Sequence, residues 1–372
     1  MAVSSPDESR MLMSVAAWRP SHNFSAAAGP LPPEVAEEVA AACRCWRGTG
    51  SVLSLPFTSE AFRQLQYETE ASLRRLLRIT CAHRLLFLQG GASAQFALAP
   101  LNLLGSSDCA AYVDTGHWSR RAMAEAARYC RVLLPEHDGS HVHALALARL
   151  EPHAAYLHIT SNETANGFQF PSLPVTTLPL VVDMTSDFLT RVVAFSRIGM
   201  MYASTQKTLG APGLTLVFIR EDMLGRAQPA TPSVMNYAAQ AEASSRLNTP
   251  PVFAIFVAHA MLCWIERQGG LEAMTQAATR RSAAVYQALD QGGGFYRPSV
   301  AVRDRSRINP CFQIADEALT ACFLAQAQAA GLSDLQGHPN VGGIRVSIYN
   351  GTSDAAVAAL VAFLREFHRV YG

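Results

Sequence analysis

Short runs of apolar residues recur along the first part of the chain, and stretches with helical spacing separate them. The runs lie at positions 85–89, 109–114, 154–160, 178–184, 199–204 and 214–220. Strands that alternate with helices in this way form a mostly parallel sheet that helices cover on both faces. The pattern therefore predicts an α/β fold.

The spacing changes after Pro250 and Pro251. A long apolar helix pattern comes next and stops at Gly269 and Gly270. Further helix patterns lie at 271–289, 319–330 and 354–370, and strand patterns lie around Phe312 and at 344–349. We therefore expect a flexible tail over residues 1–20, a large domain over 21–270 and a small C-terminal α/β domain over 271–372.

Composition narrows the classes of function. With 49% hydrophobic and 16% charged residues, the 372-residue chain is typical of a globular protein with a large core. A formal net charge of +1 provides no bulk field to attract nucleic acid or an anionic membrane. The first twenty residues lack the apolar stretch of a signal peptide, and the cysteines lack the paired spacing of a zinc site. We therefore expect a cytoplasmic protein with reduced thiols, no metal centre, and no nucleic-acid or membrane partner.

Polar and small residues follow most of the predicted strands. These clusters lie at 90–93, 115–118, 161–164, 183–187 and 205–207. Open α/β sheets bind ligands in the crevice at the carboxyl ends of their strands. We therefore expect the clusters to converge on one site.

Lys207 follows the apolar run at 199–204 and precedes a turn rich in glycine and proline. An amine at the end of a buried strand can lose its water and act as a nucleophile toward an aldehyde. Taken alone, such a lysine is more often a solvated surface charge, because lysine is rarely buried without a partner. The residues around it favour the first interpretation.

Asp183 closes another apolar run. A carboxylate in this place can keep the ring nitrogen of a pyridine cofactor protonated, which makes the ring an electron sink. The alternative is that Asp183 caps a following helix, a role that Asp187 fits better.

The small residues at 90–93 lie between a predicted strand and a helix. Backbone N–H groups at a helix start bind phosphate, although the lysine of a nucleotide-binding P-loop is missing here. Trp118 follows the next strand and offers a flat face to a heteroaromatic ring, unless it belongs to the core.

With these residues assembled, the chain resembles the phosphoserine aminotransferase family of class V, fold type I enzymes that use pyridoxal 5′-phosphate (PLP). The resemblance rests on the segments 87–96, 112–119, 160–164, 183–186, 206–207, 248–251 and 341–350. It implies a large domain with a seven-stranded, mostly parallel sheet, PLP as the cofactor, and a homodimer with shared active sites.

The resemblance also implies roles for single residues. Lys207 matches the lysine that forms a Schiff base with PLP, and Asp183 matches the partner of the pyridine nitrogen. Further cofactor contacts are implied for Ala92, Ser93, Trp118, Thr164, Gln206, Asn248 and Thr249, of which the last two reach into the neighbouring subunit's site. The implied reaction passes an amino group between an amino acid and a 2-oxo acid, with glutamate and 2-oxoglutarate as one pair.

The substrate-binding residues match the family only in part. Arg345 matches the residue that binds the α-carboxylate, which suits the planar guanidinium. One His-Arg pair of the family is replaced by a segment that contains Phe57 and Thr58, and a second is replaced by His338 and Pro339. The loss of two arginines would weaken phosphate binding by about 3 to 6 kcal/mol, or roughly two to four decades of affinity. We therefore expect an aminotransferase for an unphosphorylated or differently substituted amino acid.

Several alternatives stay open. Arg246 could enter from the neighbouring subunit and replace a lost cation, which would leave an ordinary phosphoserine aminotransferase, or it is a surface charge. Ala27 and Ala28, where the family has Gly-Pro, alter the expected roof of the site. The same cofactor allows β-elimination or racemisation. A non-catalytic relative is the fourth alternative, against which the joint presence of Lys207 and Asp183 argues.

Overall fold

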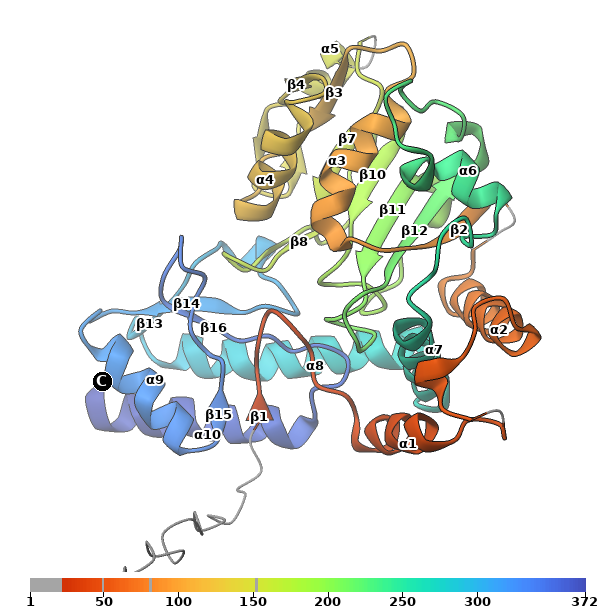
Figure 1. Ribbon diagram of the computed structural model, residues 1–372. Helices are drawn as coiled ribbons and strands as arrows, with labels where there is room; N and C mark the ends of the chain where they lie inside the picture. The colour runs from red at the N-terminus through yellow and green to blue at the C-terminus, as the bar shows by residue number, and fades with distance from the viewer. Residues whose placement is uncertain (1–21, 49, 80–81, 151–152) are drawn as a thin grey trace, which may run out of the picture.

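The computed structural model describes residues 22–372 with the exception of positions 49, 80–81 and 151–152 (Figure 1). The tail predicted at residues 1–20 therefore lies outside the described residues. A seven-stranded sheet with the order β2-β12-β11-β10-β7-β3-β4 forms the centre of the larger part of the molecule.

The strands of this sheet match the predicted apolar runs, and β4 adds an edge strand. Their bounds are β2 (His83–Leu88), β3 (Cys109–Tyr112), β4 (Arg131–Leu133), β7 (Leu157–Thr160), β10 (Leu180–Asp183), β11 (Ile198–Ser204) and β12 (Thr215–Arg220). Neighbouring strands from β4 to β11 are parallel. Strand β12 is antiparallel to both β11 and β2, because the turn before it is too short for a parallel crossover. The predicted mostly parallel sheet is confirmed.

Alternate residues of the strands enter two different apolar clusters. Val182 and Met201 lie in a cluster with α1, α2 and α7 on one face of the sheet. Val181 and Met200 lie in a cluster with α3 and α4 on the other face. The covering helices are α1 (Pro33–Arg44), α2 (Glu60–Leu77), α3 (Gly91–Leu103), α4 (His117–Ala126) and α7 (Val252–Arg267). Because both faces are covered, every residue of β7, β10 and β11 is buried.

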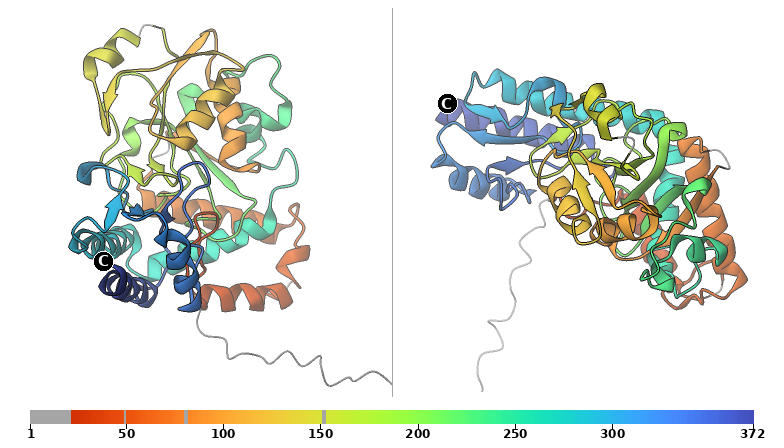
Figure 2. Two further views of the ribbon diagram at one scale, coloured as in Figure 1. Left: turned by 90° about the vertical axis from the view of Figure 1, so that its left-hand side faces the viewer. Right: turned by 90° about the horizontal axis from the view of Figure 1, so that it is seen from above.

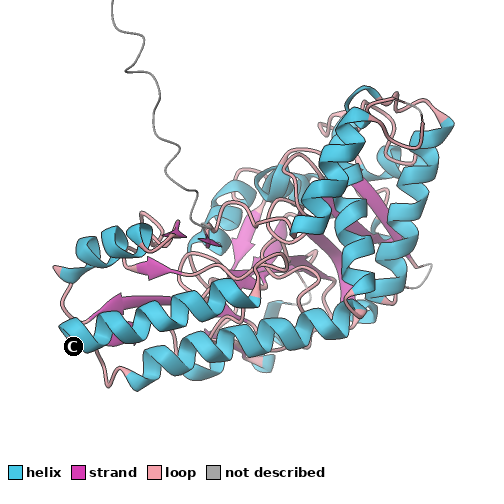
Figure 3. Ribbon diagram, turned by 90° about the horizontal axis from the view of Figure 1, so that it is seen from below, coloured by secondary structure: helices cyan, strands magenta, loops and turns pink. Residues whose placement is uncertain are grey.

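The C-terminal residues form a further apolar cluster beside the large sheet, and the right-hand view of Figure 2 shows this part (blue) at one end of the molecule. Its elements are α8 (Gly270–Gln291), β13 (Tyr296–Pro298), β14 (Cys311–Ile314), α9 (Leu319–Ala329), β16 (Ile344–Arg345) and α10 (Asp354–Tyr371). Helices α8 and α10 pack side by side (Figure 3). Phe24 belongs to the same cluster, and β1 (His22–Asn23) pairs with β15 (Leu332–Ser333). The start of the described chain is therefore anchored to the C-terminal part.

The predicted strand at 344–349 is shorter in the structure. Strand β16 ends at Arg345. Beyond it, successive backbone N–H groups donate to two different chain segments in turn. Val346 donates to the carbonyl of Pro310, and Ser347 donates to the carbonyl of Phe24. These hydrogen bonds do not form one continuous ladder, because the segment lies between two chain segments.

Short elements complete the fold around the large sheet. They are β5 (His137–Asp138), β6 (His141–Val142), α5 (Ala144–Leu150), β8 (Asn162–Glu163), β9 (Phe168–Gln169) and α6 (Tyr237–Glu242). Among the described residues, no helix combines the length and apolar character needed to span a bilayer.

Candidate functional site

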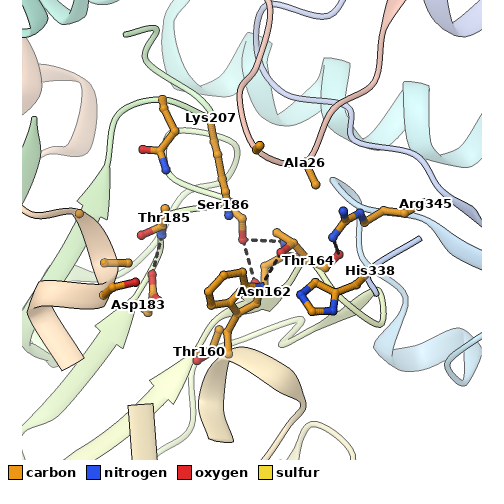
Figure 4. A pocket seen from close by; sticks show the side chains of 16 residues that line it. Ala26, Thr160, Asn162, Thr164, Asp183, Thr185, Ser186, Lys207, His338 and Arg345 are labelled. Carbon is orange, nitrogen blue, oxygen red and sulfur yellow. Dashed lines mark hydrogen bonds between the residues drawn. The ribbon is translucent and has the colours of Figure 1, made fainter. Parts of the chain in front are cut away.

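A cavity of about 360 Å³ lies at the carboxyl ends of β7, β10 and β11, between the large sheet and the C-terminal part (Figure 4). The predicted site residues that line it are Ala92, Ser93, Trp118, Thr164, Asp183, Gln206, Lys207, His338 and Arg345. They come from segments far apart in the sequence. The polar clusters at the strand ends therefore converge, as their positions predicted.

Lys207 lies in the turn between β11 and β12 and is half-buried at the cavity wall. It is the only lysine among the 372 residues. Gly29 passes directly over its backbone, since a Cβ at Gly29 would lie 2.0 Å from the Lys207 carbonyl oxygen. Burial lowers the pKa of Lys207 to about 8, with the Asp183 carboxylate opposing the shift. A part of the Lys207 population is therefore a neutral amine near neutral pH, as a nucleophile requires.

Asp183 ends β10 and is 6% exposed. Its carboxylate accepts the backbone N–H of Thr185 at 2.9 Å, in a turn and not at the start of a long helix. Burial raises the pKa of Asp183, while the hydrogen bonds from Thr185 and the charge of Lys207 counter the rise. Such a buried carboxylate suits a cationic partner in the cavity.

The Trp118 ring forms the wall across from these residues, and the Lys207 ammonium lies 5.7 Å from its centroid. The indole Nε1–H donates to Thr164 Oγ1 at 2.8 Å. Thr164 therefore holds the tryptophan in the structure, in addition to its predicted place beside a cofactor.

The end of the cavity next to helix α3 is lined by small residues. Gly90 and Gly91 have φ angles of +99° and +68°, a region that favours glycine. Ala92 and Ser93 follow in the first turn of α3, whose leading N–H groups have no carbonyl partner within the helix. Gln206 accepts a hydrogen bond from Ser204 beside this turn. The arrangement suits a phosphate group.

Arg345 comes from β16 and closes the opposite side of the cavity, next to His338 (Figure 4). Its Nη1 donates to the backbone carbonyl of Thr164 at 3.2 Å. Among the described residues no partner for its buried Nε is found. The guanidinium can therefore still bind a carboxylate.

Other predicted residues lie elsewhere in the single chain. Phe57 packs against the core and Thr58 is exposed before α2, both away from the residues around Lys207. Arg246 donates to Gln66 Oε1 at 2.9 Å. Asn248 and Thr249 are exposed and line a separate cavity next to Gln89 and Gly90. Their predicted contacts with a neighbouring subunit's site stay predictions.

Several cavity residues received no role from the sequence. Thr160, Asn162, Thr185 and Ser186 line the cavity, and Ala26 contributes to its roof beside Ala27, for which a place in the roof was expected. Glu163 was also missed, although its buried carboxylate holds the start of helix α4. All but the alanines lie within or next to the polar clusters at strand ends, which is the signal that could have identified them.

Comparison with known proteins gives one consistent result. Residues 21–360 match the family model described as aminotransferase class-V. The chain is 42% identical to a phosphoserine aminotransferase of Chromobacterium violaceum over 358 residues, covering 94% of this chain and 99% of the relative. It is 43% identical to that of Azotobacter vinelandii over 357 residues, with 94% and 98% covered.

Solved structures agree with the sequence comparison. The phosphoserine aminotransferase from Bacillus circulans subsp. alkalophilus is similar with a TM-score of 0.90 and 37% identity, over 95% of this chain and 99% of that one. The PLP-bound phosphoserine aminotransferase from Trichomonas vaginalis is similar with a TM-score of 0.87 and 33% identity, over 93% and 99%.

Proposed function

Because this chain belongs to the class-V aminotransferase family and is a PLP-dependent transaminase of fold type I, we propose that its amino acid substrate carries no phosphate. In this proposal, glutamate and 2-oxoglutarate form one substrate pair. The second pair is an amino acid, and its 2-oxo acid, with an unphosphorylated side chain.

The residues of the cavity fit PLP. Lys207 is an amine with a lowered pKa, Asp183 is a buried carboxylate across from it, and the start of α3 offers backbone N–H groups. Thr160 Oγ1 adds a buried hydroxyl for which no partner is found among the described residues. When bound, PLP supplies an aldehyde that reacts with amines and a protonated ring that withdraws electrons from the bonds of the amino acid.

We assign three tasks to the protein's own side chains. The Lys207 amine holds the cofactor and, once released, takes the proton from the α-carbon of the amino acid. The Asp183 carboxylate keeps the pyridine nitrogen protonated. The face of the Trp118 indole, whose Nε1–H donates to the Thr164 hydroxyl, would lie against the ring of the bound cofactor.

Arg345 orients the amino acid by binding its α-carboxylate. Its Nη1 donates to the Thr164 carbonyl, and its buried Nε has no hydrogen-bond partner among the described residues. A planar fork can pair with both carboxylate oxygens, which also places the α-carbon near Lys207.

The charges of the cavity carry the proposal of an unphosphorylated substrate. Among the described residues that line the cavity, two have a basic side chain other than histidine, the amine of Lys207 and the guanidinium of Arg345. Both already have tasks at the reacting carbon and the α-carboxylate. A phosphate dianion on the side chain would therefore lack a cation of its own among the described residues that line the cavity, and charges buried without a partner are costly.

Steady-state kinetics tests this proposal. We expect the value of kcat/KM with phosphoserine and 2-oxoglutarate to be below about 10⁴ M⁻¹s⁻¹, and an unphosphorylated amino acid to exceed it. An efficiency with phosphoserine above that level and above every unphosphorylated amino acid would refute it.

The second candidate is phosphoserine transamination itself. The names of the relatives at 42% and 43% identity favour it. Arg246 would then supply the missing cation from the neighbouring subunit. Replacement of Arg246 by Gln separates the two candidates. If phosphoserine is the substrate, the replacement should lower kcat/KM for phosphoserine at least tenfold. If the substrate is unphosphorylated, the replacement should leave its kcat/KM unaffected.

We also propose a homodimer in which Asn248 and Thr249 complete the partner's site. They are exposed in the single chain, at the edge of a cavity that Val234 and Met235 also line. These two residues and Leu247 are exposed large apolar residues. Such a surface is typical of an interface.

A further inference from the structure

A chain of buried polar side chains crosses from the large sheet to the C-terminal part. Asn162, in β8, is 2% exposed, and its Nδ2 donates to Ser186 Oγ at 2.8 Å and to Asn309 Oδ1 at 2.7 Å. Its Oδ1 accepts a hydrogen bond from Ser306. Asn309 Nδ2 in turn donates to Ser347 Oγ at 2.9 Å. These five residues, called the asparagine bridge below, therefore tie the two parts together.

The asparagine bridge is stiff because its members are paired more than once. Ser186 Oγ also donates to the backbone carbonyl of Asn162 at 2.8 Å. Ser306 Oγ also accepts the backbone N–H of Asn309 at 2.8 Å. All five residues are buried, so a shift of one part against the other would leave polar groups unpaired and away from water. Such a loss is costly, and a satisfied polar network therefore holds one arrangement.

The bridge runs alongside the contact between Arg345 and the large sheet. Arg345 Nη1 donates to the carbonyl of Thr164 at 3.2 Å. Asn162 lies two residues before Thr164, and Ser347 lies two residues after Arg345. The same two segments are thus tied directly at one point and through Asn309 at the other. Figure 4 shows Asn162 linked to Ser186 and Thr164 linked to Arg345 at the wall of the cavity.

The side chain of Arg345 has little support of its own. Among the described residues, the Thr164 carbonyl is the partner found for its guanidinium, and its buried Nε has none. The strand that carries it, β16, has only two residues. The place of the guanidinium therefore depends on the backbone beside it, which Ser347 attaches to the bridge.

We propose that Asn162 and Asn309 are positioning residues, which hold Arg345 at the distance from Lys207 at which its guanidinium binds the α-carboxylate of the amino acid. The inference rests on the role of Arg345 in the proposed function. The two asparagines act through Arg345, because their amide groups are already paired within the protein. A misplacement of about 1 Å in such a site can slow a reaction roughly a hundredfold, so small shifts count.

Two variants interrupt the bridge at different depths. Asn309→Leu keeps the approximate size of the side chain and removes its hydrogen bonds to Asn162 and Ser347. Ser347→Ala removes only the last link and is the milder change. The matched control is Ser282→Ala, the same substitution at a buried serine of α8 whose hydroxyl donates to the Thr279 carbonyl.

Glutarate probes the carboxylate site without reacting, since it has no amine. Its binding to the PLP-loaded enzyme is measured through the change in cofactor absorbance. We expect its Kd to rise about three- to thirtyfold in Asn309→Leu, less in Ser347→Ala, and by less than about twofold in Ser282→Ala.

Two ligands without an α-carboxylate separate positioning from a general loss of structure. Methylamine offers an amine alone, and PLP itself is titrated into the cofactor-free protein. Because neither needs Arg345, their Kd values should stay within about twofold of the wild type in both bridge variants. A disordered cavity would weaken methylamine, PLP and glutarate together.

The bridge variants are also combined with Arg345→Gln. Once the guanidinium is gone, its position no longer matters. Asn309→Leu should therefore raise the Kd for glutarate by less than about twofold in the Arg345→Gln protein, although it acts strongly in the wild type.

The failures of the two claims are distinct. If Arg345→Gln binds glutarate as well as the wild type does, the carboxylate role in the proposed function falls. If Arg345→Gln weakens glutarate but both bridge variants bind it normally, only the positioning role is overturned. Equal weakening of glutarate, methylamine and PLP, or a full additional loss in the combined variant, also overturns it. Should Asn309→Leu not fold, Ser347→Ala decides by the same measurements.

Discussion

The buried carboxylate of Glu163 accepts the backbone N–H of Trp118 at 3.0 Å. It also accepts the N–H of Ser119 at 2.7 Å and thereby binds the positive end of helix α4. Gly116 leaves the room for this contact, since a Cβ there would lie 3.0 Å from Glu163 Cδ. The position of the Trp118 ring therefore depends on a carboxylate that lies beneath it.

Replacement of Glu163 by Gln should loosen the Trp118 ring. The new NH₂ group would face the backbone N–H of either Trp118 or Ser119. Because both groups are donors, that hydrogen bond is lost and a repulsion replaces it. We expect the Kd for PLP to rise about tenfold, measured by equilibrium titration of the cofactor-free protein. Glu125→Gln at the other end of α4 is the matched control. Equal PLP affinity in both variants would show that Glu163 has no influence on the cofactor.

Lys207 should be the single site of covalent cofactor attachment. We expect borohydride to fix one cofactor per chain in the wild type and to leave the peptide around residue 207 unlabelled in Lys207→Ala. Mass spectrometry of the digested protein measures this, and the α-amino group serves as the internal control. Turnover by Lys207→Ala at the wild-type rate would contradict the assigned role.

The same lysine should reduce the stability of the cofactor-free protein. Burial lowers its pKa from 10.5 to about 8, so between these values the unfolded chain binds more protons than the folded chain. Stability from this group therefore rises with pH across that window and is lowest below it. We expect Lys207→Met to be about 1 to 3 kcal/mol more stable at pH 7, a discounted range because the side chain is half-buried.

Urea unfolding of the two cofactor-free proteins at several pH values provides the measurement. The advantage of Lys207→Met should shrink as the pH rises from 8 toward 10.5. An advantage that stays constant with pH would mean that the substitution acts through packing and not through the charge.

Two inactive variants should restore activity when mixed, if the sites are shared. One chain carries Lys207→Ala and the other carries Asn248→Ala with Thr249→Ala. A mixed dimer then contains one intact site, so random exchange should return about a quarter of the wild-type activity. Denaturation and joint refolding allow the exchange. A mixture in which both chains carry Lys207→Ala is the control and should stay inactive. If the mixture of the two different variants also recovers no activity, a site completed by Asn248 and Thr249 is excluded.

The positions of most strands and most of the cavity could be predicted from the sequence, because both depend on local signals. Short apolar runs marked β7, β10 and β11, and the polar residues behind them marked the cavity. The antiparallel direction of β12 was not foreseen, although the segment 205–213 between the two predicted runs is short for a parallel crossover.

Other features depend on contacts between distant segments. Nothing near Glu163 in the sequence indicates that it binds α4, and Asn340 shows no local sign of its contacts with two histidines. Ala26 lines the roof because the Tyr349 hydroxyl donates to its carbonyl at 3.0 Å, across the two ends of the chain. Such pairs become visible only when the chain is folded.

The one lysine of this protein is half-buried at the cavity wall, and every other permanent side-chain cation is an arginine. Coupling reagents that target amines should therefore attach to the N-terminal amino group and leave the remaining surface untouched. Immobilisation on an aldehyde resin would tether every molecule by the same end, with a uniform orientation. A bound cofactor would shield the single internal amine during that coupling.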